Sequence, residues 1–310
     1  MAIKGTLPVL PTPFRDGHVD AASLERMLKR TIPYVDGYTV LGSTGEAPSM
    51  TIDERKDAVE AILKLTPADK SVVVGIAHTS VTDSVRLAQH AQKHGAKGVL
   101  LPAPFYFPNT PDGIFNFLRV VDDAIDIDLV LYDNPVTTKT TLASGVVTEW
   151  ARQLKHLSTV KLTDHDIAKV EAWKSSGLNV LAGDDVILFR YLAAGVDGSM
   201  VLAPAIFPEP FATVWDHMRS GDVEQAFAVF ASELLPFMHV FGVGDEIPTS
   251  KALLHEIGIF ESAELRPPLQ ATTPARIKLL MLAYRQCTMA ADTRLSGDRK
   301  SRQPTGIHRR

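Results

Sequence analysis

Short β-branched and apolar runs alternate with longer stretches of helical period over the first two thirds of the chain. This alternation is typical of parallel β-α units, in which a helix returns the chain to the same edge of the sheet. Several helical stretches open with a Ser, Thr or Asp that can cap free N–H groups, and Thr51 with Glu54 has capping-box spacing. Eight strands are predicted, over residues 6–10, 37–41, 71–77, 98–101, 128–132, 158–163, 179–183 and 198–202, with helices beginning near residues 20, 51, 79, 110, 142, 164 and 184.

Eight strands within about 200 residues fit a closed (β/α)8 TIM barrel better than an open doubly wound sheet, which remains the alternative. After Leu202 the strand pattern ends, and helices alone are predicted, over residues 210–219, 223–241, 249–257 and 274–287. The apolar side chains of these helices must be buried against another part of the protein. We therefore expect an α/β barrel core over 1–206, a C-terminal helical extension over 207–290 packed on it as one unit, and a flexible tail over 291–310.

Composition narrows the function classes. Of the 310 residues 45% are hydrophobic and the net charge is −4, so the chain can bury a large core and has no general basic field for nucleic acid. Its one cysteine, Cys287, excludes an intrachain disulfide and suits a reducing cytoplasm. No apolar signal region or membrane-length run occurs, so we expect a cytoplasmic protein without nucleic acid or membrane partners.

Metal chemistry is not favoured by the sequence. The ten histidines show no compact set of histidine and carboxylate ligands; among them are His78, His90, His94, His165, His239 and His255. A metal-dependent aldolase is therefore the less favoured hypothesis. We expect neither a metal nor another cofactor.

Lys161 lies inside the short β-branched and apolar run 158–163. A lysine ammonium is strongly hydrated, so an inward-facing lysine in a strand needs a reason. Desolvation disfavours the charged ammonium, and a neutral amine can attack a carbonyl to form a Schiff base. The hexapeptide by itself favours the alternative, a lysine on the solvent side of the strand.

Other polar residues follow the ends of predicted strands. The loop 42–46 offers the hydroxyls of Ser43 and Thr44 and free N–H groups that could hold a small carboxylate, although a simple glycine-rich turn would look the same. Tyr132 ends the fifth strand, where a phenol can relay protons or only pack. Because strand ends meet at one face of a barrel, these groups and Lys161 could together form and protonate the imine of a 2-oxo acid.

The loop 102–108 is rich in proline and aromatic residues. It would expose a large apolar patch unless something covers it. Packing within the chain is one explanation. A subunit contact that projects Tyr106 is the other.

Several separated motifs occur in one recognisable order. They are Thr12-Pro13-Phe14 with Val19-Asp20, the loop Gly42 to Glu46, Tyr132 to Pro135, Lys161, Gly183-Asp184-Asp185, and Ala194 to Gly198. Over about residues 5–287 the chain resembles the dihydrodipicolinate synthase and N-acetylneuraminate lyase family. The resemblance implies a (β/α)8 barrel with a C-terminal helical extension, usually in a homotetramer built as a dimer of dimers.

The resemblance also implies roles for individual residues. Lys161 would form the Schiff base with pyruvate or a similar 2-oxo acid, and Tyr132 would pass protons to and from the reacting atoms. Ser43 and Thr44 would bind the 2-oxo acid carboxylate, with Ser43 linking Tyr132 to solvent, and Tyr106 would enter a neighbouring subunit's site. Further substrate contacts would come from Gly45, Thr163, Gly183, Asp185 and the backbone carbonyl of Met200.

Four positions bear on the substrate. Thr137 stands where dihydrodipicolinate synthases usually carry an arginine, and threonine cannot supply that charged bidentate fork. Asp133 replaces a usual asparagine. The acidic position of sialic acid lyases aligns with Val186, just after Asp185, while Thr163 resembles that branch. The second substrate is therefore neither of the two best known, or is bound by different residues.

A lyase or aldolase acting on pyruvate or a related 2-oxo acid through Lys161 is the main hypothesis. A dehydratase or deaminase of a sugar-derived or hydroxyproline-derived 2-oxo acid could use the same imine. A catalytically silent member that binds a 2-oxo acid or a partner protein for regulation is the alternative from another class.

Overall fold

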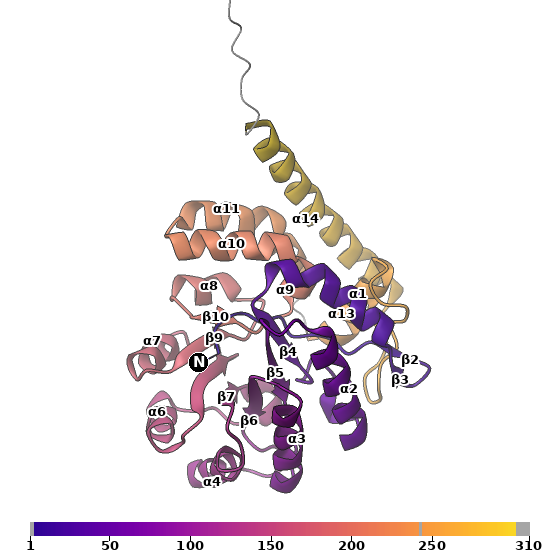
Figure 1. Ribbon diagram of the computed structural model, residues 1–310. Helices are drawn as coiled ribbons and strands as arrows, with labels where there is room; N and C mark the ends of the chain where they lie inside the picture. Colours follow the sequence, from indigo (N-terminus) through magenta and orange to yellow (C-terminus); the bar gives the residue numbers. More distant parts are fainter. Residues whose placement is uncertain (1–2, 242–243, 302–310) are drawn as a thin grey trace, which may run out of the picture.

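Parallel strands form one continuous eight-stranded sheet in the computed structural model, which describes residues 3–241 and 244–301 (Figure 1). The strand order around the sheet is β1-β10-β9-β8-β7-β6-β5-β4. The strands are β1 (Gly5–Thr6), β4 (Gly37–Val40), β5 (Ser71–Gly75), β6 (Gly98–Pro102), β7 (Asp128–Asp133), β8 (Leu157–Leu162), β9 (Asn179–Ala182) and β10 (Gly198–Ser199).

The sheet closes where the segment after β1 meets β4. Val9 forms a parallel bridge with Thr39, and the Leu10 N–H donates to the Thr39 carbonyl at 2.9 Å. The predicted barrel is thus confirmed. The predicted first strand is nevertheless interrupted after Thr6, because Pro8 has no N–H for a ladder.

Helices surround the strands on the outside (Figure 1). The predicted capping box is confirmed: the Glu54 N–H donates to Thr51 Oγ1 at 3.2 Å, and the Thr51 N–H donates to Glu54 Oε2 at 2.8 Å. A two-stranded hairpin, β2 (Phe14–Arg15) with β3 (His18–Val19), precedes the first helix. The barrel helices are α1 (Ala21–Thr31), α2 (Ile52–Leu65), α3 (Val81–Lys93), α4 (Pro111–Asp122), α5 (Pro135–Thr138), α6 (Ser144–Gln153), α7 (Ala168–Ser175), α8 (Leu188–Ala193) and α9 (Ala203–Ile206), with 3-10 turns η1 (Ile32–Tyr34) and η2 (Ala47–Ser49).

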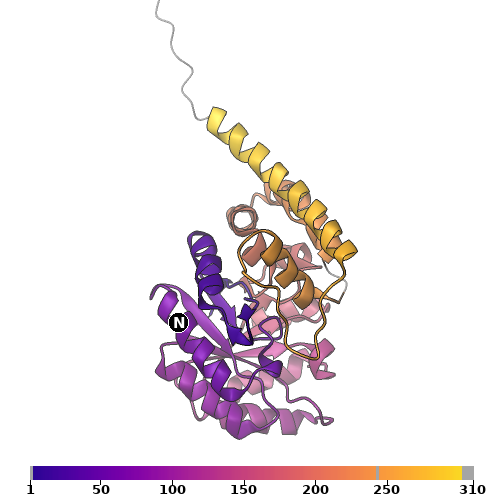
Figure 2. The same cartoon turned by 90° about the vertical axis from the view of Figure 1, so that its right-hand side faces the viewer.

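The C-terminal helices stack on one side of the barrel in both ribbon views (Figures 1 and 2). Phe189 of α8 lies with its ring centroid 5.2 Å from that of Phe227 and 5.0 Å from that of Phe230, both in α11, so the extension contacts the barrel there. The helix predicted over 223–241 is two helices, because the backbone turns at Leu234 and Pro236 lacks an N–H. The extension comprises α10 (Pro208–Ser220), α11 (Val223–Glu233), α12 (Leu235–Phe241), α13 (Glu246–Glu256) and α14 (Pro274–Ser301).

The last helix is longer than the sequence indicated. α14 continues through Ser301, so the flexible tail expected over 291–310 does not begin at 291, and residues 302–310 lie outside the described residues. Arg294 joins α14 to the extension, with Nη2 2.8 Å from Glu209 Oε2 and Nε 2.7 Å from Glu233 Oε1. These ion pairs attach α14 to α10 and α11 beyond Cys287.

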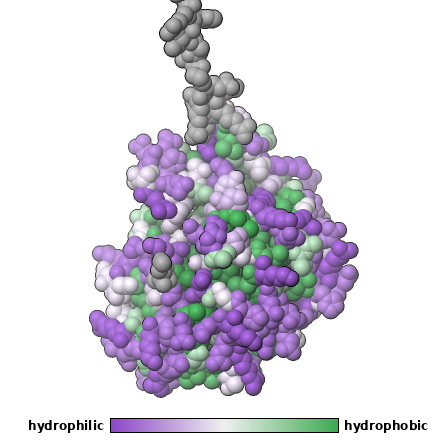
Figure 3. All heavy atoms as spheres, in the orientation of Figure 1, coloured by the Kyte–Doolittle hydropathy of each residue, from purple (hydrophilic) through white to green (hydrophobic). Residues whose placement is uncertain are grey.

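Most of the surface in Figure 3 is hydrophilic, with apolar atoms gathered around the middle of this face. No helix among the described residues is both long and apolar enough to cross a bilayer. Cys287 is fully buried, and burial raises the pKa of its thiol to about 11, which makes it unreactive.

Candidate active site

Lys161 and Tyr132 face each other on neighbouring strands. They are direct partners in the β7/β8 register, and Lys161 Nζ lies 4.1 Å from the centroid of the Tyr132 ring. Lys161 is only 4% exposed, so the solvent-side alternative is wrong. Among residues 3–241 and 244–301, no carboxylate or hydrogen-bond acceptor is paired with Nζ. The amine is therefore buried and available to a ligand.

A cavity of about 280 Å³ opens in front of this amine at the C-terminal ends of the strands. In a (β/α)8 barrel this end is where reacting groups and specificity loops meet. The structure brings together most of the site residues predicted from sequence. Those that line the cavity are Ser43, Thr44, Tyr132, Thr137, Lys161, Thr163, Gly183 and Asp185.

Ser43 and Thr44, whose hydroxyls were predicted to bind a carboxylate, line the cavity beside Tyr132. Within the described ranges, no hydrogen bond connects the side chains of Ser43, Thr44 and Tyr132 to one another. Catalytic hydrogen bonds often tighten only when substrate is bound. These hydroxyls are therefore placed to take a carboxylate or a reacting oxygen as their partner.

Two predicted glycines shape the site through close backbone approach. A Cβ at Gly183 would lie 2.5 Å from Thr163 Oγ1, and the Thr163 hydroxyl donates to the Gly183 carbonyl at 3.3 Å. A Cβ at Gly45 would lie 2.9 Å from the Leu41 nitrogen, and Gly45 does not line the cavity. Thr12 Oγ1 donates to the Gly45 carbonyl at 2.7 Å, so the backbone of Gly45 holds the loop 42–46 in place without lining the cavity.

Met200 and Tyr106 also lie away from the cavity of their own chain. Met200 is fully buried, and its N–H donates to the Ala182 carbonyl at 2.7 Å. Tyr106 is 86% exposed, has a positive φ of 90°, and contacts the edge of Phe107 at 5.0 Å between ring centroids. The aromatic loop is thus uncovered in the single chain, and its role at a subunit contact stays a prediction.

Asp185 is a wall residue of the cavity with both carboxylate oxygens engaged. Oδ2 accepts the Leu202 N–H at 2.9 Å and Oδ1 accepts the Ala203 N–H at 2.7 Å. Burial raises the Asp185 pKa to about 6, while the two backbone donors and Lys161 act to lower it. These bonds hold the turn into α9, and β10 itself ends at Ser199, before the predicted residue 202.

Glu46 joins the loop 42–46, which carries Ser43 and Thr44, to the helical extension. Sequence analysis did not predict this contact. Lys251 Nζ of α13 donates to Glu46 Oε1 at 2.6 Å, both side chains are fully buried, and the Arg266 N–H donates to Oε2 at 2.8 Å. Burial lowers the pKa of Lys251, and Glu46 acts against that shift. Lys251 directly precedes the apolar residues Ala252, Leu253 and Leu254 in the predicted helix, so the argument made for Lys161 could have found it.

Asp133, where asparagine is usual, has a cation of its own. Asp133 is fully buried, with Oδ2 2.7 Å from Lys169 Nζ, and Lys169 also contacts Asp164 Oδ2 at 2.6 Å. Burial raises the Asp133 pKa and Lys169 acts to lower it. The extra carboxylate is therefore matched by Lys169 behind the site, a pairing that sequence analysis did not predict.

A second cavity of about 330 Å³ adjoins the first through Ser43, Tyr132 and Thr137. Lys161 is the only cationic side chain among the described residues that line either cavity. No other cation therefore replaces the arginine expected at Thr137. The apolar side chains of the second cavity are Leu41, Ala47, Pro48, Ala77, Leu100, Pro102, Phe105, Ile247, Pro268 and Leu269.

The expectation that the histidines form no compact set with carboxylates is wrong. His90, His94 and Glu60 converge outside the active site. None of them lines either active-site cavity. The set could not be recognised in the sequence, because Glu60 belongs to α2 whereas His90 and His94 belong to α3.

Comparison with known proteins gives a consistent family. The family model described as "Dihydrodipicolinate synthetase family" matches residues 2–281. A 4-hydroxy-tetrahydrodipicolinate synthase of Pelobacter propionicus is 31% identical over 274 residues, covering 86% of this chain and 92% of the relative. A dihydrodipicolinate synthase variant described as monomeric has a TM-score of 0.87 at 27% identity, covering 92% of this chain and 97% of that one.

A further structure shares the fold. It is YagE, an Escherichia coli K12 prophage protein of the dihydrodipicolinic acid synthase family in complex with pyruvate, with a TM-score of 0.85, 24% identity, and coverage of 91% of this chain and 98% of that one. The family match spans nearly the whole barrel and most of the extension. This chain belongs to the dihydrodipicolinate synthetase family.

Proposed function

We propose that this chain is a class I lyase that makes or breaks a bond in pyruvate or a related 2-oxo acid through a Schiff base on Lys161. Family membership makes it an aldolase-type lyase. One observation carries the proposal: the buried Lys161 amine, without a paired group among the described residues, lies 4.1 Å from the Tyr132 ring in a cavity edged by hydroxyls.

Each residue has a chemical part in this reaction. Ser43 and Thr44 hold the 2-oxo acid carboxylate, which directs the ketone carbon toward Lys161 Nζ. The unprotonated amine adds to that carbon, and the carbinolamine expels hydroxide to leave an iminium. The iminium draws electrons, so that the neighbouring carbon releases a proton, which Tyr132 relays to the departing hydroxide to form water. The resulting enamine attacks a second carbonyl carbon, and Tyr132 delivers the proton to the developing alkoxide. Hydrolysis of the imine then restores the lysine.

Exchange of the pyruvate methyl protons with solvent deuterium tests this sequence of steps. An enzyme with a working imine exchanges them, whereas a silent 2-oxo-acid binder does not. The products from candidate substrates then separate an aldolase from a dehydratase or a deaminase. Absence of exchange would contradict the proposal.

We also propose that the second substrate carries no carboxylate at the end that reaches Thr137. Apart from Lys161, the described cavity walls offer no cation, and the adjoining cavity is mainly apolar. Burying a charged group against such walls is costly. An uncharged aldehyde fits this surface better than one that bears a carboxylate.

Thr137→Arg is expected to change this preference. The new guanidinium supplies a permanent bidentate donor, so kcat/KM for carboxylate-bearing aldehydes should rise about 10-fold relative to uncharged aldehydes. Kinetics with pyruvate and a matched aldehyde pair measure the ratio. Thr141→Arg, at an exposed threonine that lines neither cavity, is the control. Equal ratios in both variants would count against the proposed location of the second substrate.

A homo-oligomer that covers the aromatic loop belongs to the same proposal. Tyr106 is 86% and Phe107 is 73% exposed, and two adjacent uncovered aromatic rings are typical of a contact surface. We expect Tyr106→Ala with Phe107→Ala to shift sedimentation toward smaller species and to lower kcat. Phe227→Ala, at an aromatic residue 52% exposed on α11, should do neither. A monomeric active wild-type chain would contradict the oligomer.

The single buried thiol, Cys287, supports a cytoplasmic location.

A further inference from the structure

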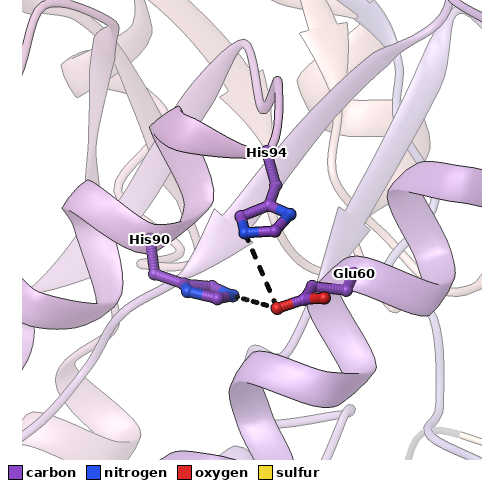
Figure 4. A group of neighbouring side chains, drawn as sticks. All are labelled: Glu60, His90 and His94. Atoms are coloured by element: carbon purple, nitrogen blue, oxygen red, sulfur yellow. Dashed lines mark ion pairs between the residues drawn. The ribbon is translucent and has the colours of Figure 1, made fainter.

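Glu60 of α2 and two histidines of α3 converge on the outer wall of the barrel (Figure 4). His90 and His94 are four residues apart on one helix, which places both rings on the same face. Figure 4 shows the Glu60 carboxylate directed at both rings from the neighbouring helix. The cluster lies outside both active-site cavities, so the proposed lyase chemistry leaves it without a role.

The distances are those of a metal-ligand set. Glu60 Oε1 lies 3.2 Å from His90 Nε2 and 3.6 Å from His94 Nε2, and all three ligand atoms lie within 4.8 Å of one another. Tetrahedral coordination with bonds of about 2.1 Å places ligand atoms about 3.4 Å apart. Both carboxylate–imidazole separations match this geometry. The two imidazole rings stack with their centroids 4.4 Å apart.

His90 Nε2 gives a second, independent indication of a ligand. This atom is buried and has no hydrogen-bond partner among the described residues, although Glu60 is close. Buried polar atoms are rarely left without a partner, and a bound ion is one of the few explanations for an exception.

The local field contains one favourable and one opposing contribution. His94 is the C-cap residue of α3, and the C-terminal end of a helix favours a cation. Lys56, one turn before Glu60 on α2, opposes a cation, but its Nζ is 4.0 Å from Asp53 Oδ1. Glu60 itself supplies a negative charge at the ligand position. The balance therefore permits a divalent ion at this site.

We propose that Glu60, His90 and His94 bind a divalent transition-metal ion, with Zn²⁺ as the best match to two imidazoles and one carboxylate. Such a set leaves a coordination position for water and suits zinc better than magnesium or calcium, which prefer oxygen ligands. The ion links α2 to α3 on the barrel wall. Because it binds the folded chain, it acts as a stabilising element separate from the imine site.

Zinc binding to untagged, chelator-treated protein tests the proposal. Isothermal titration is expected to give one equivalent per chain, and zinc at about 100 times Kd should raise Tm by about 5 °C. Cobalt in place of zinc should give the visible absorption of a four-coordinate nitrogen and oxygen site. Glu60→Ala and His94→Ala should each weaken zinc binding at least about 10-fold.

Both substituted side chains are partly exposed, at 48% for Glu60 and 30% for His94, so the variants should fold. His217→Asn is the matched control, because His217 Nδ1 faces one carboxylate, Asp222, at 3.5 Å and belongs to no ligand set found in the described residues. It should bind zinc as the wild type does. Binding that is equally strong in His94→Ala, or no binding at millimolar zinc, would overturn the site. Neither result would affect the proposed lyase reaction, which uses other residues.

Discussion

Lys161→Ala is expected to lower turnover by about 10⁴-fold or more, because the described walls of both cavities carry no second lysine that could form the Schiff base. The fold should be retained, since the Lys161 amine is paired with no carboxylate among the described residues and its removal leaves no uncompensated charge there. Borohydride reduction with pyruvate followed by mass spectrometry should place a covalent adduct on Lys161 in the wild type. The variant should carry none.

Tyr132→Phe separates imine formation from the later proton transfers. This variant keeps the ring beside Lys161 and removes only the hydroxyl, so the borohydride adduct should still form. Turnover should fall about 100-fold, the usual effect of a lost acid-base group. Lys155→Ala, at an exposed lysine on a surface pair with Asp123, should leave both readouts unchanged. An adduct on a residue other than Lys161 would exclude the mechanism.

The barrel could be predicted because its signals are local. The hydrophobic period of each strand and helix can be recognised within its own segment, and few topologies can join eight parallel strands into one closed sheet. The errors fall where a distant contact decides the outcome. β10 ends at Ser199, and Asp185 then accepts the N–H groups of Leu202 and Ala203 in the turn into α9, while α14 continues to Ser301 beside the Arg294 ion pairs.

The active site likewise contains residues that could be predicted from the sequence and residues that could not. Lys161, Tyr132 and Ser43 could be brought together from sequence, because strand ends in a barrel meet at one face. The supporting charges could not, since Lys251 is 205 positions from Glu46 and Lys169 is 36 positions from Asp133. Periodicity shows which face of a helix is buried, but it does not show which charge lies opposite. The Glu60 and histidine cluster was missed for the same reason.

Lys251→Ala is expected to destabilise the protein by about 3–5 kcal/mol, because it leaves the Glu46 carboxylate buried without its cation. The pair has no exposed side-chain surface and an Nζ–Oε1 distance of 2.6 Å. Urea unfolding measures the loss. Lys29→Ala, which removes an exposed pair with Glu25 at 2.7 Å, is the control and should cost less than about 1 kcal/mol.

The double variant Glu46→Gln with Lys251→Met shows whether charge pairing or packing carries this effect. Removing both charges leaves nothing uncompensated, so stability should recover most of the way to the wild type. The consequence for catalysis follows from position, since Glu46 ends the loop that carries Ser43 and Thr44. Lys251→Ala should therefore raise KM for pyruvate while the Lys161 adduct still forms. If the double variant were as unstable as Lys251→Ala, the contact of Lys251 Nζ with the Phe14 ring, 4.2 Å from its centroid, would be the dominant contribution.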